Sequence, residues 1–179
     1  MSMPTTDFKC DACNFQSSST VIWGSSHYLD ESNAEVNLEK ILGWCCECQS
    51  IAPIECFDDE LLIITKIIEH SQHLQPSFAH IIKWVFSGEY RNHLGSINRL
   101  NKRLSIIKLR KGKECCLNCG SQNVDTIFQG NKQASSINSS ETLHPGCKSH
   151  GKLNAQPGLN INMSLSPRFY DLNGEEIDH

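Results

Sequence analysis

Hydrophobic and polar residues follow two different rhythms along this chain. Towards both ends, short runs of strand-favouring residues alternate with turn-forming residues, as in residues 51–55 and 159–163. Such runs predict short β-strands. In the middle third the apolar residues recur at helical spacing instead. The pattern therefore predicts an α+β protein in which strand-rich ends flank a helical middle segment.

Two helices are predicted most clearly. Asp58, Asp59 and Glu60 precede an apolar stripe, and a helix dipole favours carboxylates in the first turn, so a helix begins there. Another apolar stripe runs through residues 90–107, where each residue advances by about 100°. Arginine and lysine occupy the opposite face of this second helix.

Other segments of the middle region are ambiguous. Residues 33–42 fit either a helical insertion or a loop that returns into a strand. Residues 76–88 show a third helical pattern, opened by a proline and ended by a glycine. Apolar and basic residues alternate over 106–110, which favours a change from helix to strand. We interpret His70, His73 and His80 as surface or helix-end histidines.

The cysteines carry the strongest chemical signal. Cys10 and Cys13 form one C-x2-C pair, and Cys45 and Cys48 form another. Two such turns can bring four thiolates into a tetrahedron, for which zinc is the usual metal in a reducing compartment. These four residues are the first predicted zinc site. Cys46 is an alternative ligand to Cys45, although the C-x2-C spacing favours Cys45.

A second ligand set lies nearer the carboxyl end. Cys116 and Cys119 form a C-x2-C pair followed by glycine, and His144 and Cys147 have the same spacing around a Pro-Gly turn. Together they predict a Cys3His zinc site. His150 is the competing nitrogen ligand, and the Pro-Gly turn favours His144. Two zinc ions are therefore the expected cofactors.

The first set, with a strand before and after each C-x2-C turn, resembles the zinc-ribbon and rubredoxin-like class of metal modules over roughly the first 57 residues. We accordingly expect two small zinc-ribbon-like β modules around the helical middle. The expected divisions are an amino-terminal module over 1–57, a helical segment over 58–107, and a carboxyl-terminal module with a terminal β-hairpin over 108–179.

Charge is distributed unevenly. The net charge is −4, yet residues 83–113 hold nine lysines and arginines against the single acid Glu89. A basic segment in an acidic chain indicates a surface for a partner of opposite sign, or one that pairs with the chain's own acids. The candidate contacts to nucleic acid or an acidic partner are Arg91, Arg99, Lys102, Arg103, Lys108, Arg110 and Lys111.

Signatures of catalysis are missing from the sequence. A phosphate-loop-like G-x4-G-K over residues 146–152 has Leu153 where serine or threonine would bind magnesium. Sites with four protein ligands are structural, whereas a catalytic zinc needs an open position. An enzyme would require one site to be three-coordinate, for example Cys116, Cys119 and Cys147 with water. The vicinal cysteine pairs leave open a redox-labile zinc.

These observations lead to a functional expectation. We expect a non-enzymatic, cytoplasmic zinc protein that acts as a protein-interaction module or adaptor, with no membrane segment and no small-molecule substrate. The first residues lack a secretory signal, and no apolar run reaches the roughly 20 residues that a bilayer requires. The alternative is a nucleic-acid-binding protein that uses the basic segment from Lys83 to Lys113.

Overall fold

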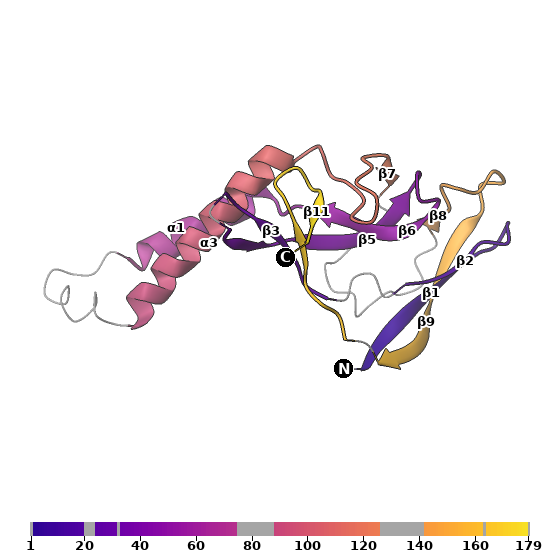
Figure 1. Cartoon of the computed structure of the whole chain (residues 1–179), viewed down its shortest axis with the longest axis horizontal. Coiled ribbons are helices and arrows are strands. Elements are labelled where there is room, and N and C mark those ends of the chain that lie inside the picture. The colour runs from indigo at the N-terminus through magenta and orange to yellow at the C-terminus, as the bar shows by residue number, and fades with distance from the viewer. Residues whose placement is uncertain are drawn as a thin grey trace, which may run out of the picture.

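The computed structural model describes residues 2–19, 24–31, 33–74, 88–125, 142–162 and 164–178. Within these ranges the chain forms two helices and three small sheets, which confirms the predicted α+β class. The two helices form a hairpin that extends from one end of the molecule, and the longest strands lie at the other end (Figure 1). Neither described helix combines the length and apolar character needed to cross a membrane.

Sheet A joins the two ends of the chain. Its antiparallel strands lie in the order β2 (Gln16–Ser19), β1 (Ser2–Cys10), β9 (Lys152–Asn162) and β8 (Thr142–Leu143). Phe8 pairs with Ala155, and Cys10 pairs with Leu153. All four side chains are buried, and polar residues alternate with them on the exposed face. This alternation buries one face of the sheet and sets its register.

Sheet C is the central layer, with strand order β6 (Ser50–Cys56), β5 (Glu39–Cys45) and β7 (Val124–Asp125). Residues 39–42 lie in β5, so the strand alternative for the ambiguous segment is correct and the helical one is wrong. Gly43 is required where β7 approaches β5, because an added Cβ would lie 2.7 Å from the Asp125 carbonyl oxygen. Pro53 is tolerated because β6 is an edge strand.

Sheet B brings the carboxyl-terminal tail beside an early segment. Its strand order is β11 (Glu176–Ile177), β10 (Arg168–Tyr170), β3 (Ser26–Leu29) and β4 (Glu35–Asn37). β10 runs parallel to β3, and the other neighbours are antiparallel. Gly174 has φ of 88° in the turn before β11, a left-handed conformation that glycine adopts readily.

Helix α1 (Glu60–Gln72) begins as the acidic cluster predicts, with the Asp59 side chain accepting a hydrogen bond from the Leu61 amide at 3.0 Å. Helix α3 (Gly88–Arg110) is longer than predicted. The expected change to a strand over 106–110 is wrong, because α3 remains helical and buries Ile106, Ile107 and Arg110. The helical pattern over 76–87 lies outside the described residues, and Gly88 is the first residue of α3.

Sheets A and C share one hydrophobic cluster, and sheet B shares another with α3. The first consists of Phe8, Cys10, Leu42, Trp44, Ile51, Cys147, Leu153 and Ala155. The second consists of Tyr28, Val36, Leu38, Ile106, Leu117 and Tyr170. Both clusters draw members from early and late parts of the chain, so each joins segments that are distant in sequence.

A buried ion pair lies where α3 meets sheets B and C. Arg110 donates to a Glu55 carboxylate oxygen at 2.7 Å, and both side chains are at most 5% exposed. The Cys115 amide donates to the same carboxylate at 3.1 Å, and Tyr28 donates to its other oxygen. Arg110 also donates to the Asn173 carbonyl. These partners satisfy a buried carboxylate that would otherwise be costly to desolvate.

Candidate metal centres

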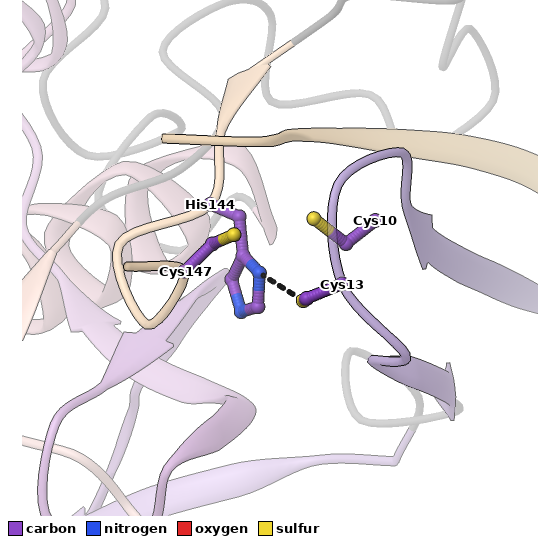
Figure 2. A group of neighbouring side chains, drawn as sticks. All are labelled: Cys10, Cys13, His144 and Cys147. Atoms are coloured by element: carbon purple, nitrogen blue, oxygen red, sulfur yellow. Dashed lines mark hydrogen bonds between the residues drawn. The ribbon is translucent and has the colours of Figure 1, made fainter. Parts of the chain in front are cut away.

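Four side chains converge where the β1–β2 hairpin meets the β8–β9 hairpin, and we call Cys10, Cys13, His144 and Cys147 the outer group. Their ligand atoms all lie within 4.8 Å of one another. Cys10 is the last residue of β1 and Cys13 lies in the turn to β2, whereas His144 and Cys147 lie in the turn between β8 and β9 (Figure 2). The antiparallel pairing of β1 with β9 brings the two turns together.

A second set of four cysteines lies where the β5–β6 turn of sheet C meets the turn over residues 116–119, and we call Cys45, Cys48, Cys116 and Cys119 the inner group. Their sulfur atoms also lie within 4.8 Å of one another. The Cys45 and Cys119 sulfurs are 3.5 Å apart, and those of Cys48 and Cys116 are 3.9 Å apart. A tetrahedral zinc with bonds of about 2.3 Å separates its sulfurs by about 3.8 Å. The inner group therefore already has nearly the spacing that zinc requires.

The predicted grouping of the ligands is wrong. Cys10 and Cys13 do not meet Cys45 and Cys48, and the turn at Cys116 does not meet the turn at His144. The reason is strand pairing. β9 lies beside β1, whereas β7 and an isolated bridge from Ile54 to Cys116 hold the other turn against sheet C. Sequence spacing identifies two ligands within a turn, but not which turns meet.

The structure also decides the two alternative ligands. His144 is 4% exposed and its Nδ1 lies 3.5 Å from the Cys13 sulfur, whereas His150 is exposed and belongs to neither group (Figure 2). Cys45 lies in the inner group, and Cys46 does not. The Cys46 amide instead donates to the Asn123 carbonyl at 3.0 Å, which anchors the neighbouring loop.

Aromatic rings hold the imidazole of the outer group in place. The centroid of His144 lies 4.6 Å from that of Trp44 and 4.7 Å from that of Phe15. Its Nδ1 faces the Cys13 sulfur (Figure 2), so Nδ1 is the nitrogen that would bind a metal. Its Nε2 is buried and has no hydrogen-bond partner among the described residues. Burial lowers the pKa of His144 below the ordinary histidine value, which keeps the ring neutral at pH 7. A neutral imidazole is the form that binds metal.

Burial also determines the thiol chemistry of the inner group. It raises the pKa of Cys116 to about 11 and raises that of Cys48 as well. For Cys119, burial opposes ionisation, but hydrogen bonds from the Ser121 backbone and neighbouring thiols lower its pKa overall. A divalent cation would stabilise all four thiolates and displace their protons. Gly120, which follows the second cysteine of this turn, has φ of 74°. This left-handed conformation favours glycine, as the C-x2-C-Gly pattern predicts.

Both donor sets fit zinc. Thiolate and imidazole are the ligands that structural zinc takes in proteins. Each group supplies four of them, so side chains would occupy all four positions of a tetrahedral zinc. Bound zinc would supply a strong crosslink between segments that are distant in sequence. The arrangement thus has the chemistry of a structural site.

Several of the predicted basic contacts pair with the chain's own acids. Lys102 lies 2.6 Å from Asp30, and Lys111 lies 3.2 Å from Glu60. These pairs connect α3 to the segment after β3 and to the start of α1.

Two arginines of α3 are more deeply engaged. Arg103 bridges Glu39 at 2.7 Å and Asp58 at 2.6 Å, and Arg110 forms the buried pair with Glu55. The remaining three candidates, Arg91, Arg99 and Lys108, are exposed. Much of the charge on the basic helix therefore stabilises the fold.

The aromatic support of His144 and the buried carboxylate of Glu55 were not predicted. Glu55 lies in β6, and the pattern of apolar and polar residues in this strand does not indicate that an acid is buried. Its partner, Arg110, is 55 residues further along the chain. Trp44 precedes the candidate ligand Cys45, and this position only weakly indicates that its ring packs against another candidate ligand, His144.

Comparison of the chain with protein-family models, curated proteins and solved structures found no match.

Proposed function

We propose that this chain is a non-enzymatic zinc protein in which two structural zinc ions, each within a zinc-ribbon-like unit, support a protein-interaction module. The observation that carries the proposal is the pair of closed ligand sets, each with four ligand atoms within 4.8 Å of one another. Closed tetrahedral sites contribute folding energy and leave no position for a substrate. The same thiolates require a reducing compartment such as the cytoplasm.

The location of the two groups supports a structural role. Each group joins one turn from the first third of the chain to one turn from its last part. Holding such distant segments together costs loop-closure entropy, which metal coordination offsets. Zinc ions at these points would stabilise sheets A and C.

Elemental analysis of protein purified under reducing conditions tests the structural part of the proposal. We expect two zinc ions per chain and loss of the folded far-UV circular dichroism spectrum when a strong chelator removes them. Protein that contains no stoichiometric zinc, or that keeps its fold after chelation, would contradict the proposal.

The hairpin of α1 and α3 is the favoured surface for a protein partner. It extends away from the sheets (Figure 1), and α1 exposes Leu61 by 71% and Ile68 by 51%. These two residues are seven positions apart, so they lie on one face of the helix, with the 37% exposed Ile64 between them. Exposed apolar residues that share a helix face are typical of sites that bind an apolar groove.

Affinity capture from the source cell tests this interaction. The variant with Leu61→Glu and Ile68→Glu should lose a captured protein that the wild-type chain retains. Leu159→Glu is the matched control, because Leu159 is 80% exposed but lies on β9, away from the hairpin. Equal loss with Leu159→Glu, or retention with the double variant, would place the interaction elsewhere.

Nucleic-acid binding through α3 is the second proposal. Its support is the exposure of Arg91, Arg99 and Lys108 on one helix. Binding through them should weaken steeply with salt, and Arg99→Glu should flatten that dependence. Four basic residues of this segment make five internal ion pairs, which favours the first proposal, because charges already neutralised by the chain release few counterions.

A further inference from the structure

Three histidines meet at the end of the helical hairpin that lies farthest from the sheets. His70 is in the last turn of α1, His73 caps the end of that helix, and His93 is in the second turn of α3. The end of α1 and the start of α3 lie together there (Figure 1). None of these residues belongs to the outer or the inner group.

The imidazole of His93 contacts both of the others. The Nδ1 atoms of His70 and His93 are 2.9 Å apart, and their ring centroids are separated by 5.2 Å. His73 stacks on the ring of His93, with its centroid 4.9 Å from that of His93 and an angle of 23° between the rings. His70 and His93 are partly buried, and His73 is exposed.

The contact between His70 and His93 places two nitrogen lone-pair positions almost face to face. Such a contact is favourable when one ring donates a proton and the other accepts it. A divalent metal can replace the shared proton and bind both nitrogens. Zinc bonds of about 2.0–2.1 Å in a tetrahedron separate two nitrogens by about 3.3 Å, so the two nitrogens would move apart by about 0.4 Å. The rings would also tilt until both lone pairs point at the ion.

The third histidine lies beside this pair, against the ring of His93. Among the described residues only the outer and inner groups already have all their ligand atoms within 4.8 Å of one another, so His73 must change its side-chain rotamer to join the site. His73 follows His70 by three positions, which places both side chains on neighbouring turns of one helix face. Because His73 is exposed, its side chain can rotate from the stacked position towards the two nitrogens. We propose that His70, His73 and His93 form a third metal site, which binds a divalent transition metal such as zinc.

This site differs in kind from the outer and inner groups. It has three imidazoles and no thiolate, and its fourth position is left to water or an external ligand. Glu89 lies one turn before His93 on α3 and could supply a carboxylate from the protein. Fewer and harder ligands bind zinc more weakly, so the third ion would exchange while the two structural ions stay bound. The site would clamp α1 against α3 when it is occupied.

A zinc titration of the full chain, first loaded with its two structural ions, tests this inference. Isothermal titration calorimetry should detect one further equivalent of zinc, and His70→Gln or His93→Gln should weaken its binding at least tenfold. His27→Gln is the matched control, because His27 lies on β3, where it stacks on Phe169. Absence of a third equivalent, or its persistence in both hairpin variants, would overturn the proposal.

A measurement on the wild-type chain avoids any dependence on the folding of the variants. Addition of the third equivalent should shift the imidazole nitrogen resonances of His70, His73 and His93 and leave that of His27 unchanged. Shifts at His27 alone, or no shifts, would exclude the site. Elemental analysis of the first two equivalents reports separately on the structural zinc sites, so either proposal can fail without the other.

Discussion

The outer and inner groups are built from the same kind of turn, yet they differ in how much of the chain they enclose. The outer group joins Cys13 to His144, and the inner group joins Cys48 to Cys116 within that interval. The inner group in turn encloses the helical hairpin. The two candidate sites are therefore nested, rather than placed one after the other along the chain.

Nesting makes the outer group depend on the inner one. Trp44, which packs against His144 of the outer group, is adjacent to Cys45 of the inner group on β5. Cys45 and Cys116 are fully buried. The inner group consequently fixes the strand that supports the outer group, whereas β1 and β9 are not needed to form the inner group. Loss of the two sites should therefore have unequal effects.

The largest effect is expected from Cys116→Ser. Removing this buried ligand should abolish the inner site and loosen β5, so zinc content should fall from two per chain to below one. Structural zinc contributes on the order of 10 kcal/mol to such folds, and its loss should unfold most of the sheet structure. Elemental analysis and far-UV circular dichroism measure both outcomes. A variant with one full zinc ion and a wild-type melting temperature would contradict the nested dependence.

The outer counterpart, Cys147→Ser, should have a smaller effect. One zinc ion should remain, and hydrogen-exchange protection should be lost in β1 and β9 while β5 and β6 stay protected. The reason is that the inner ligands and their strands do not include sheet A. Hydrogen exchange followed by mass spectrometry distinguishes the strands. Loss of both zinc ions would show that the sites depend on each other equally.

Glu55→Gln tests the buried ion pair beside the inner group. It leaves the Arg110 charge buried without its partner, which should lower the free energy of unfolding by about 3–5 kcal/mol. Urea denaturation of the zinc-loaded protein measures the change. The double variant Glu55→Leu with Arg110→Met should lose less, since neither charge remains. An equal loss in both variants would indicate that packing, rather than charge, dominates at this position.

The two groups should also respond differently to pH. Zinc displaces protons from thiols, so its affinity falls as pH falls. His144 is already neutral at pH 7 because burial lowers its pKa, and its nitrogen is lost to a metal only when pH falls through that lowered pKa. The outer group thus releases at most three protons and the inner group at most four.

A difference of one proton changes the ratio of the two affinities about tenfold per pH unit. Competition with a chromophoric chelator between about pH 7 and pH 8 measures this ratio, with Cys147→Ser reporting the inner site alone. His144→Cys should remove the difference between the sites. Parallel pH dependences in the wild-type chain would be inconsistent with a neutral His144.

The smallest effect is expected where α3 meets the start of sheet C. Arg103→Ala removes the bridge to Glu39 and Asp58, and should lower the free energy of unfolding by about 1 kcal/mol. The control is Arg99→Ala, at an exposed position of the same helix, which should change stability by less than about 0.5 kcal/mol. Chemical denaturation compares the two. A larger loss at Arg99 would mean that its charge is also structural.

Local features of this fold were largely predictable. Asp59 caps α1, and Gly120 takes the left-handed conformation in its turn, because each feature depends on a few neighbouring residues. The spacing of two candidate ligands within one turn is also a local feature, so the sequence predicts it. In contrast, the end of α3 was misplaced, since Ile106 and Arg110 are helical because of what they pack against.

Partners that are distant in sequence were not predictable. β1 pairs with β9, and β3 pairs with β10, through backbone hydrogen bonds that any two strands can form. The same limit applies to the histidines of the hairpin, because His93 joins His70 only after α1 and α3 have packed.

The sequence by itself determined that this is an α+β protein with four short turns that each carry two metal-ligand side chains, because a turn and its spacing are local properties. Only the tertiary structure decided that the first turn meets the last and that the two inner turns meet each other. The physical reason is that this choice depends on which strands share a buried face, and burial is a property of the whole fold.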